Sequence, residues 1–252
     1  MLNGIDLRYF QKNGYLLLPN LLSAGELHEA RENMLRLLKQ AEPAHPRVRY
    51  SLEPSEKSGG QPVCENNPRR VWMVMDTPLA GDWWYANIRD PRIVTAMTQL
   101  LGPNINFHNG KARIKPPGYT SHQVWHQDWP YERHSTSDLA AAIFYLDDTE
   151  KGASATEVLP GSHLQGEWPH DDGNAIDEDL VANFGSEPVA LEASAGSVAI
   201  IHVMVVHRAT ENRSSLNRSA IINEYKTAEA MDLWGNQCAF ADLPLARGGV
   251  PL

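Results

Sequence analysis

The second half of the chain is built from short β-type segments, and this feature most constrains the fold. From Asn104 onward, runs rich in β-branched and aromatic residues alternate with clusters of Gly, Pro, Asn and Asp. The clearest runs span residues 106–115, 140–146, 197–206 and 219–226. Short strands separated in this way are typical of antiparallel barrels and jelly rolls. We therefore expect a mainly β core.

The first hundred residues have a different pattern, which predicts helices. Ser23 with Glu26 three residues later matches a capping box at a helix start, and Gly102-Pro103 would end a later helix. A short buried strand is expected at 15–19. The expected helices cover residues 7–13, 23–40 and 91–101.

No internal repeat and no clear boundary divides the sequence. We predict one domain over residues 1–252, which is within the size range of single β-barrel or β-sandwich domains. Its parts would be supporting helices in 1–103, the β core in about 104–227 and a C-terminal tail in 228–252.

Two segments are candidates for contact with a substrate. Residues 41–67 are rich in Pro, Ser, Gly and charge, and so long an irregular segment in a compact domain suggests a lid or substrate loop. Residues 69–75 and 83–85 are rich in Met, Trp and Tyr. They predict either a second core or one wall of an apolar pocket.

Composition excludes several classes of partner. The net charge of −9 argues against nucleic acid, because phosphate binding needs a clustered basic surface. Only Cys64 and Cys238 are present, too few for a disulfide framework. The start of the chain lacks the pattern of a signal peptide, and no apolar run reaches 18 residues. We expect a cytoplasmic monomer or homodimer with no membrane or nucleic-acid partner.

A candidate metal site begins at His126 and Asp128. In an extended strand, residues i and i+2 point to one face, so an imidazole and a carboxylate would converge. A third ligand could come from the apolar run that ends at His207. His202 is the alternative in that run. His202 and His207 are separated by an odd number of positions, so in a regular strand their side chains point to opposite faces and only one of them can face the metal. Two histidines and a carboxylate form the facial triad of non-haem iron(II) oxygenases.

Arg218 follows His207 by eleven residues, and residues 211–217 between them are strongly turn-forming. This pattern predicts a hairpin that brings Arg218 beside the strand of His207. A buried arginine there needs an anionic partner, and a carboxylate fits its planar fork. The distal carboxylate of 2-oxoglutarate is such a partner.

These motifs together resemble the phytanoyl-CoA dioxygenase family of 2-oxoglutarate-dependent oxygenases. The matching elements are HQD at 126–128, EVLPGSH at 157–163 and the H-x4-N-x5-R pattern from His207 to Arg218. The resemblance runs from the N-terminal helix to about Tyr225. The resemblance implies a double-stranded β-helix. In the family pattern the arginine follows the distal metal ligand by eleven residues, which favours His207 over His202 as the ligand.

The resemblance also implies residue roles. His126, Asp128 and His207 would bind Fe(II), and Arg218 would hold the distal carboxylate of the co-substrate 2-oxoglutarate, with O2 as second co-substrate. Members that tailor natural products carry a Gln and a Thr at two further positions. Gln123 and Thr156 match these, which implies that both contact 2-oxoglutarate.

The sequence departs from the family at the distal histidine, where a hydroxyl residue is common two positions later but Ala209 stands here. Thr156 or Thr210 would then replace that hydroxyl. The carboxylate of Asp128 argues against halogenation, which needs a small residue at this place. No role follows for Lys111 and Lys115, which read as surface charges of a strand. Five further histidines are expected to be non-ligands: His108, His122, His134, His163 and His170.

The implied activity is oxidation of an unactivated C–H bond by hydroxylation, cyclisation, epimerisation or desaturation. The expected substrate is a small, largely apolar natural-product intermediate from secondary metabolism. A fatty acyl-CoA or a small acid is the alternative within the family. A cupin-like metal-binding isomerase, lyase or sensor is the alternative of another class, although such a protein needs no arginine for a dicarboxylate.

Overall fold

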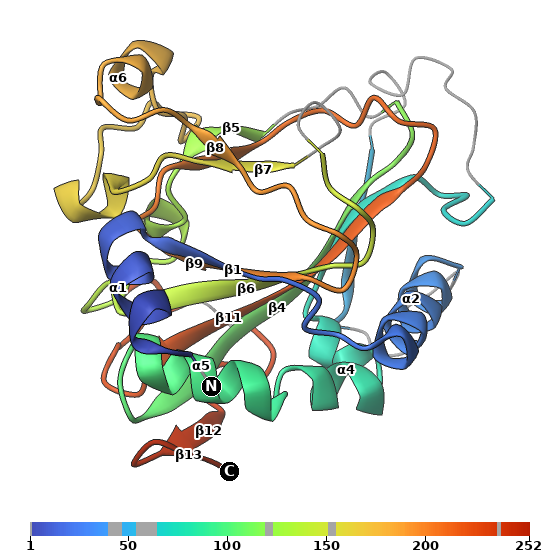
Figure 1. Ribbon diagram of the computed structural model, residues 1–252. Coiled ribbons are helices and arrows are strands. Elements are labelled where there is room, and N and C mark those ends of the chain that lie inside the picture. The colour runs from blue at the N-terminus through green and yellow to red at the C-terminus, as the bar shows by residue number, and fades with distance from the viewer. Residues whose placement is uncertain (1, 40–46, 54–64, 119–122, 151–154, 236–237) are drawn as a thin grey trace.

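Two antiparallel sheets face each other in the computed structural model, which describes residues 2–39, 47–53, 65–118, 123–150, 155–235 and 238–252 (Figure 1). The predicted mainly β, jelly-roll architecture is confirmed. In the larger sheet the strand order is β1 (Tyr15–Leu18), β9 (Val198–His202), β6 (Leu139–Tyr145), β11 (Arg218–Thr227), β4 (Ile105–Lys115), β12 (Pro244–Arg247) and β13 (Val250–Pro251). On the same sheet, β3 (Val71–Met75) pairs with β4, and β2 (Arg49–Leu52) pairs with β3. In the smaller sheet the order is β5 (Gln123–His126), β10 (His207–Ala209), β7 (Thr156–Val158) and β8 (Val189–Ala190).

Helices cover the outer face of the larger sheet, opposite the smaller one (Figure 1). These are α1 (Gly4–Asn13), α2 (Ala24–Lys39), α4 (Asp82–Asn87) and α5 (Pro91–Leu100). The remaining short elements are η1 (Thr77–Ala80), η2 (Trp129–Tyr131), η3 (Ser162–Gln165) and α6 (Glu178–Ala182). None of the helices in the described ranges is long and apolar enough to cross a membrane.

The helix starts follow from local capping. Ser23 and Glu26 form the predicted capping box, with each side chain accepting a hydrogen bond from the other's backbone N–H. At the start of α5, Asp90 accepts from the backbone N–H of Arg92, and Pro91 occupies the first turn, where its missing N–H costs nothing. The predicted helices and the strand at 15–19 are confirmed.

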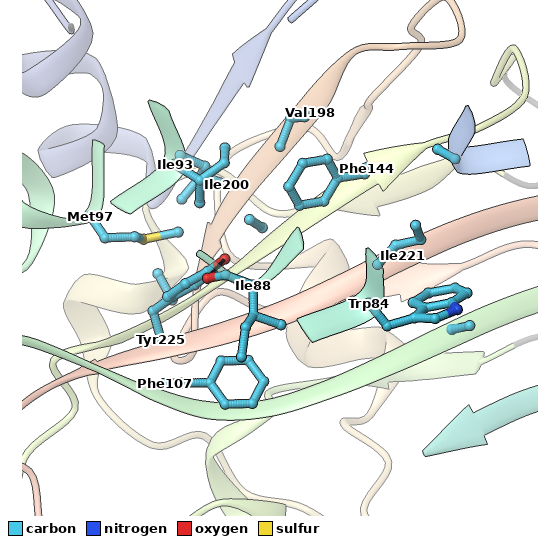
Figure 2. Close-up of a cluster of buried hydrophobic side chains, with 14 of the residues drawn as sticks. Trp84, Ile88, Ile93, Met97, Phe107, Phe144, Val198, Ile200, Ile221 and Tyr225 are labelled. Atoms are coloured by element: carbon cyan, nitrogen blue, oxygen red, sulfur yellow. Dashed lines mark hydrogen bonds between the residues drawn. The ribbon is translucent and has the colours of Figure 1, made fainter. Parts of the chain in front are cut away.

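Strand β6 is buried on both faces and therefore divides the interior into two cores. Ala142 and Phe144 pack against the helices, whereas Ile143 and Tyr145 point between the two sheets. Figure 2 shows Phe144 in the helix-side core with Trp84. This double burial explains why the sequence of β6 is continuously apolar rather than alternating.

Phe144→Ala should destabilise the protein by roughly 3–5 kcal/mol, because it removes a fully buried ring and leaves a cavity. Chemical denaturation followed by circular dichroism measures this free energy of unfolding. Leu164→Ala, at a position that is 64% exposed, is the matched control and should change it by no more than about 0.5 kcal/mol. Equal effects of the two substitutions would contradict this assignment of the core.

The expected single strand over 197–206 is wrong beyond His202. Strand β9 ends there, and the backbone N–H of Val205 donates to the carbonyl of His202 at 2.9 Å, which turns the chain. The chain then crosses to the smaller sheet, where β10 begins at His207. The two histidines therefore lie on different sheets, and strand parity is not what separates them.

The predicted hairpin between His207 and Arg218 is also wrong. Strand β10 pairs with β5 and β7, whereas β11, which begins at Arg218, pairs with β4 and β6. The intervening turn-forming segment thus connects the two sheets and does not join neighbours in one sheet. Arg218 can approach His207 only across the space between the sheets.

Three of the expected segments need correction. The supposed loop 41–67 contains strand β2, and much of the rest of it lies outside the described residues. The supporting region 1–103 was expected to hold helices and the strand at 15–19, but it also supplies β2 and β3 to the larger sheet. The supposed tail 228–252 adds β12, which pairs with β4, because the edge of that long strand is otherwise unpaired there.

Candidate active site

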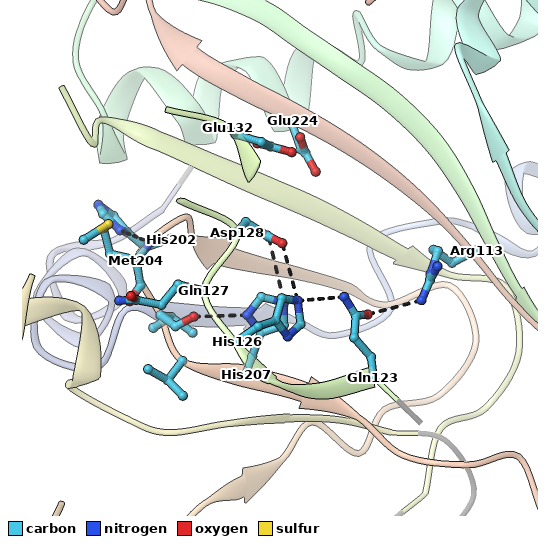
Figure 3. Close-up of polar contacts among 12 residues, drawn as sticks. Arg113, Gln123, His126, Gln127, Asp128, Glu132, His202, Met204, His207 and Glu224 are labelled. Atoms are coloured by element: carbon cyan, nitrogen blue, oxygen red, sulfur yellow. Dashed lines mark hydrogen bonds and ion pairs between the residues drawn. The ribbon is translucent and has the colours of Figure 1, made fainter. Parts of the chain in front are cut away.

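The smaller sheet brings His126 and His207 together, because they are direct partners across β5 and β10. Asp128 lies just beyond β5 with helical backbone angles (φ −71, ψ −23), so the expected extended strand through Asp128 is wrong. Its carboxylate nevertheless lies 3.6 Å from Nε2 of His126 and 3.8 Å from Nε2 of His207 (Figure 3). The structure therefore brings the three predicted ligands to one point.

Hydrogen bonds to the backbone orient both imidazoles. Nδ1 of His126 lies 2.8 Å from the carbonyl of Val124, and Nδ1 of His207 lies 3.0 Å from the carbonyl of Val205. A carbonyl oxygen only accepts, so each Nδ1 carries the proton and each Nε2 presents a lone pair. This is the arrangement found around histidines that bind metals through Nε2.

The charge states also suit a metal. Burial opposes ionisation of Asp128, but His207, His126 and Lys111 outweigh it and lower the pKa of Asp128 below its ordinary value. Burial and the neighbouring His126 lower the pKa of His207 to about 4. At neutral pH the site thus offers an ionised carboxylate and a neutral imidazole, the forms that bind metal ions.

Among the described residues, the ligand atoms of His126, Asp128 and His207 lie within 4.8 Å of one another. Two imidazoles and one carboxylate are the donor set of non-haem Fe(II) sites with open coordination positions. The residues present therefore fit a mononuclear iron.

His202→Ala should leave metal binding intact, with the same number of iron ions per chain as the parent protein. His202 ends β9 on the opposite sheet, and its Nδ1 accepts a hydrogen bond from the backbone N–H of Met204 at 3.1 Å. Iron analysis after anaerobic reconstitution and gel filtration measures this. Loss of iron from a folded His202→Ala protein would mean that the ligand is misassigned.

A small cavity of about 90 Å³ beside His207 gathers the predicted co-substrate contacts. Gln123 and Thr156 reach it together, because both stand opposite Ala209 on the two sides of β10. Arg218 enters from the other sheet; its Nε is buried and has no hydrogen-bond partner within the described ranges. An arginine placed in this way suits an anionic ligand.

A larger cavity of about 450 Å³ adjoins the first, since His207, Gln123 and Arg113 line both. Asp128 lines only the larger one. The Met-rich segment 69–75 has a mixed role: Met73 and Met75 line this cavity, whereas Val71 and Val74 belong to the helix-side core. Both alternatives expected for that segment are thus realised, on opposite faces of β3.

Lys111 and Lys115 are not surface charges, contrary to expectation. Lys111 lines the larger cavity and Lys115 the smaller one, and burial lowers the pKa of Lys115 to about 7. Both lie on β4, where Arg113 stands between them at the same parity. Side chains at alternate positions of a strand share one face, so these three cations lie on the same face of β4. This spacing was the sequence signal that could have predicted a basic wall of the cavities.

Other cavity residues had no role in the sequence-based site. Tyr145 lines the smaller cavity, and its buried hydroxyl has no hydrogen-bond partner among the residues described. Glu132, Glu224 and His108 line the larger one. Cys238 lines it as well and is a free thiol, whereas Cys64 and His122 fall outside the described residues.

The chain is similar to known proteins, several of which are dioxygenases. The model of the phytanoyl-CoA dioxygenase (PhyH) family matches residues 10–220. A probable alpha-ketoglutarate-dependent hypophosphite dioxygenase of Stutzerimonas stutzeri is 31% identical over 156 residues, which cover 59% of this chain and 54% of that protein. An ectoine dioxygenase of Bordetella parapertussis is 25% identical over 254 residues, covering 90% of this chain and 76% of that one.

A solved structure with the same fold is the non-heme alpha ketoglutarate dependent carbocyclase SnoK from nogalamycin biosynthesis. It matches with a TM-score of 0.76 at 20% identity and covers 99% of this chain and 96% of that chain. The family match spans most of the sequence and includes all three motifs. The chain therefore belongs to the phytanoyl-CoA dioxygenase family.

Proposed function

We propose that this protein is an Fe(II)- and 2-oxoglutarate-dependent oxygenase in which His126, Asp128 and His207 bind the iron. The observation that carries this proposal is the convergence of both Nε2 lone pairs on the Asp128 carboxylate. The distances are 3.6 and 3.8 Å, and each Nδ1 is fixed by a backbone carbonyl. His207 lines both cavities, and Asp128 lines the larger one.

The smaller cavity is the proposed site of 2-oxoglutarate. Arg218 would pair with the distal carboxylate through its Nε, which has no partner among the described residues. Lys115, the direct register partner of Arg218, would become a second cation there, because a bound anion raises the pKa that burial lowers. Thr156 would supply a hydroxyl. A dianion is suited to this concentration of positive charge.

Gln123 would contact the end of 2-oxoglutarate that lies near the iron. Its Nε2 now donates to Nε2 of His126 at 2.7 Å, and its Oε1 accepts from Arg113 at 3.2 Å. A metal on Nε2 of His126 would take the lone pair that this amide uses. The amide N–H would then need a new acceptor. A carboxylate or keto oxygen of 2-oxoglutarate bound in the smaller cavity, which Gln123 lines, would supply one.

When bound, iron with 2-oxoglutarate and O2 supplies the oxidation: 2-oxoglutarate loses CO2 and takes up one atom of O2 to give succinate, and the other atom of O2 oxidises a substrate C–H bond. The protein's own residues orient the reactants and exclude water. Asp128 keeps its position at the metal occupied, which favours hydroxylation or a related C–H oxidation over halogenation.

The substrate would lie in the larger cavity, which is of the size that holds one small molecule. We propose a natural-product intermediate, and the likeness to an enzyme of nogalamycin biosynthesis supports this. The cavity matches the expected apolar substrate only in part. Apolar side chains such as Met73 and Ile143 line some of its wall, and charged side chains line the remainder. A polyanionic acyl-CoA fits less well, because acidic side chains, among them Glu132 and Glu224, offset the basic ones that line the same cavity.

Succinate release from 2-oxoglutarate by iron-loaded protein tests the proposal without knowledge of the substrate. Slow substrate-independent turnover is expected, and it should stop when a chelator removes iron. A protein that binds iron but neither binds nor consumes 2-oxoglutarate would instead be a metal-dependent isomerase, lyase or sensor.

A further inference from the structure

A second cluster of buried polar residues lies in the larger cavity, on the side away from the imidazoles (Figure 3). It contains Glu132, just after η2, and Glu224 on β11. Nδ2 of Asn109 donates to Oε1 of Glu132 at 3.2 Å and also to Oε2 of Glu224. Nζ of Lys111 lies 2.5 Å from Oε1 of Glu224 and 3.8 Å from Oε1 of Glu132. The cluster thus ties two carboxylates to one ammonium.

The cluster carries more acid than its neighbours neutralise. Two carboxylates face one lysine, while Lys226 is paired with Asp242 at 2.6 Å. His108 adds no positive charge, because burial lowers its pKa. Burial raises the pKa of both Glu132 and Glu224. A neighbouring acid raises each pKa further: Asp128 acts on Glu132, and Glu132 acts on Glu224. Burying a surplus carboxylate is costly, and such groups are kept mainly where a ligand uses them.

The cluster also contains unused hydrogen-bonding atoms. Nε2 of His108 is buried and has no hydrogen-bond partner among the described residues, although it lies 3.5 Å from Oε2 of Glu132. Oδ1 of Asn109 is likewise buried without a donor. His108 is only 2% exposed and lines the cavity. An unpartnered buried amide oxygen at a cavity wall, such as Oδ1 of Asn109, points to a ligand that supplies an N–H donor.

We propose that Glu132 and Glu224 form a subsite for a positively charged nitrogen of the substrate, an ammonium or amidinium group. This inference rests on the proposed function, because it places the cation in the same cavity as Asp128 and His207. The apolar side chains of Met73, Ile143 and Ile222 would contact the body of the substrate. With its nitrogen anchored on the acidic pair, the substrate would present a C–H bond to the metal side.

A second metal ion is the competing occupant, since ligand atoms of His108, Glu132 and Glu224 also lie within 4.8 Å of one another. The ammonium of Lys111 argues against it. That group already lies 2.5 Å from one carboxylate oxygen and would repel a divalent cation placed among the same oxygens. An organic cation has a single charge spread over several N–H donors, so it can share the two carboxylates with Lys111.

The test is a binding panel of small amines, each paired with a neutral isostere: pyrrolidine with cyclopentanol, piperidine with cyclohexanol, and L-proline with cyclopentanecarboxylate. Binding to protein loaded with iron and 2-oxoglutarate is measured anaerobically by calorimetry, and succinate release is measured in air. We expect amines, and not their isosteres, to bind and to raise succinate release. Glu132→Gln and Glu224→Gln should weaken amine binding by on the order of ten- to a hundredfold.

Glu53→Gln is the matched control, because Glu53 is a buried glutamate paired with Arg70 and does not line this cavity. It should leave amine binding unchanged. The proposal is overturned if no amine binds, if amines and isosteres bind equally, or if the Gln variants bind amines as the parent does. A second equivalent of Mn(II) per chain that disappears in Glu132→Gln would assign the cluster to a metal instead. Failure of the parent protein to bind iron or release any succinate would contradict the proposed function and not this subsite.

Discussion

His207→Ala will prevent stable Fe(II) binding and abolish succinate release. His207 supplies one of two imidazole ligands, and neither water nor Asp128 can replace its fixed Nε2. Changes to groups that only support a ligand typically cost about 10- to 100-fold in metal affinity, so removal of the ligand itself should cost more. Iron stoichiometry and succinate release, each compared with the parent protein, measure the effect.

The His202→Ala protein is the control for this experiment, since it removes a half-buried imidazole at the end of β9, on the other sheet. Thermal unfolding followed by circular dichroism establishes that both variants are folded. Iron retained at the parent stoichiometry in His207→Ala would contradict the assignment of the triad.

Arg218→Ala will weaken 2-oxoglutarate binding by roughly 30- to 4000-fold, while iron stoichiometry stays at the parent value. Loss of one partner of a buried charge pair typically costs about 2–5 kcal/mol, which converts to this range. Anaerobic calorimetry with iron-loaded protein gives the dissociation constant. Arg218→Lys should recover only part of the affinity, because an ammonium cannot form the bidentate contact of a guanidinium.

Arg92→Ala is the matched control, because Arg92 makes its ion pairs with Glu26 and Asp90 at the surface, away from both cavities. It should not change 2-oxoglutarate affinity. Unchanged affinity in Arg218→Ala would show that another cation, such as Lys115, carries the distal carboxylate.

Local chemistry made much of this fold predictable. The capping pair Ser23 and Glu26 marks its helix because the two residues satisfy each other's backbone donors without help from the rest of the chain. The apolar run of β6 predicted a strand because burial on both faces leaves it no polar positions.

Features that depend on how the two sheets pack could not be read from local patterns. The segment between His202 and His207 is uniformly apolar and contains no Gly, Pro or Asn, so nothing in it signals that the chain leaves one sheet for the other. The hairpin expected before Arg218 failed for the same reason. A turn signal shows where the chain bends but not which strand it pairs with next.

The candidate site was more predictable than the topology around it. The predicted ligands converge although Asp128 lies outside the strand that was expected to orient it, and although His207 and Arg218 come from opposite sheets. The acidic pair of Glu132 and Glu224 gave no signal, because the two residues are 92 positions apart and come together only in the folded chain, where β4 contacts both.

The most direct test of the central assignment is an anaerobic titration of metal-free protein with Fe(II) and 2-oxoglutarate, followed by visible absorption. Chelation of iron by a 2-oxo acid gives a charge-transfer band that neither component gives alone. The structure predicts that this band saturates at one iron and one 2-oxoglutarate per chain and is absent in His207→Ala. No band in the parent protein, or an undiminished band in folded His207→Ala, would contradict the account.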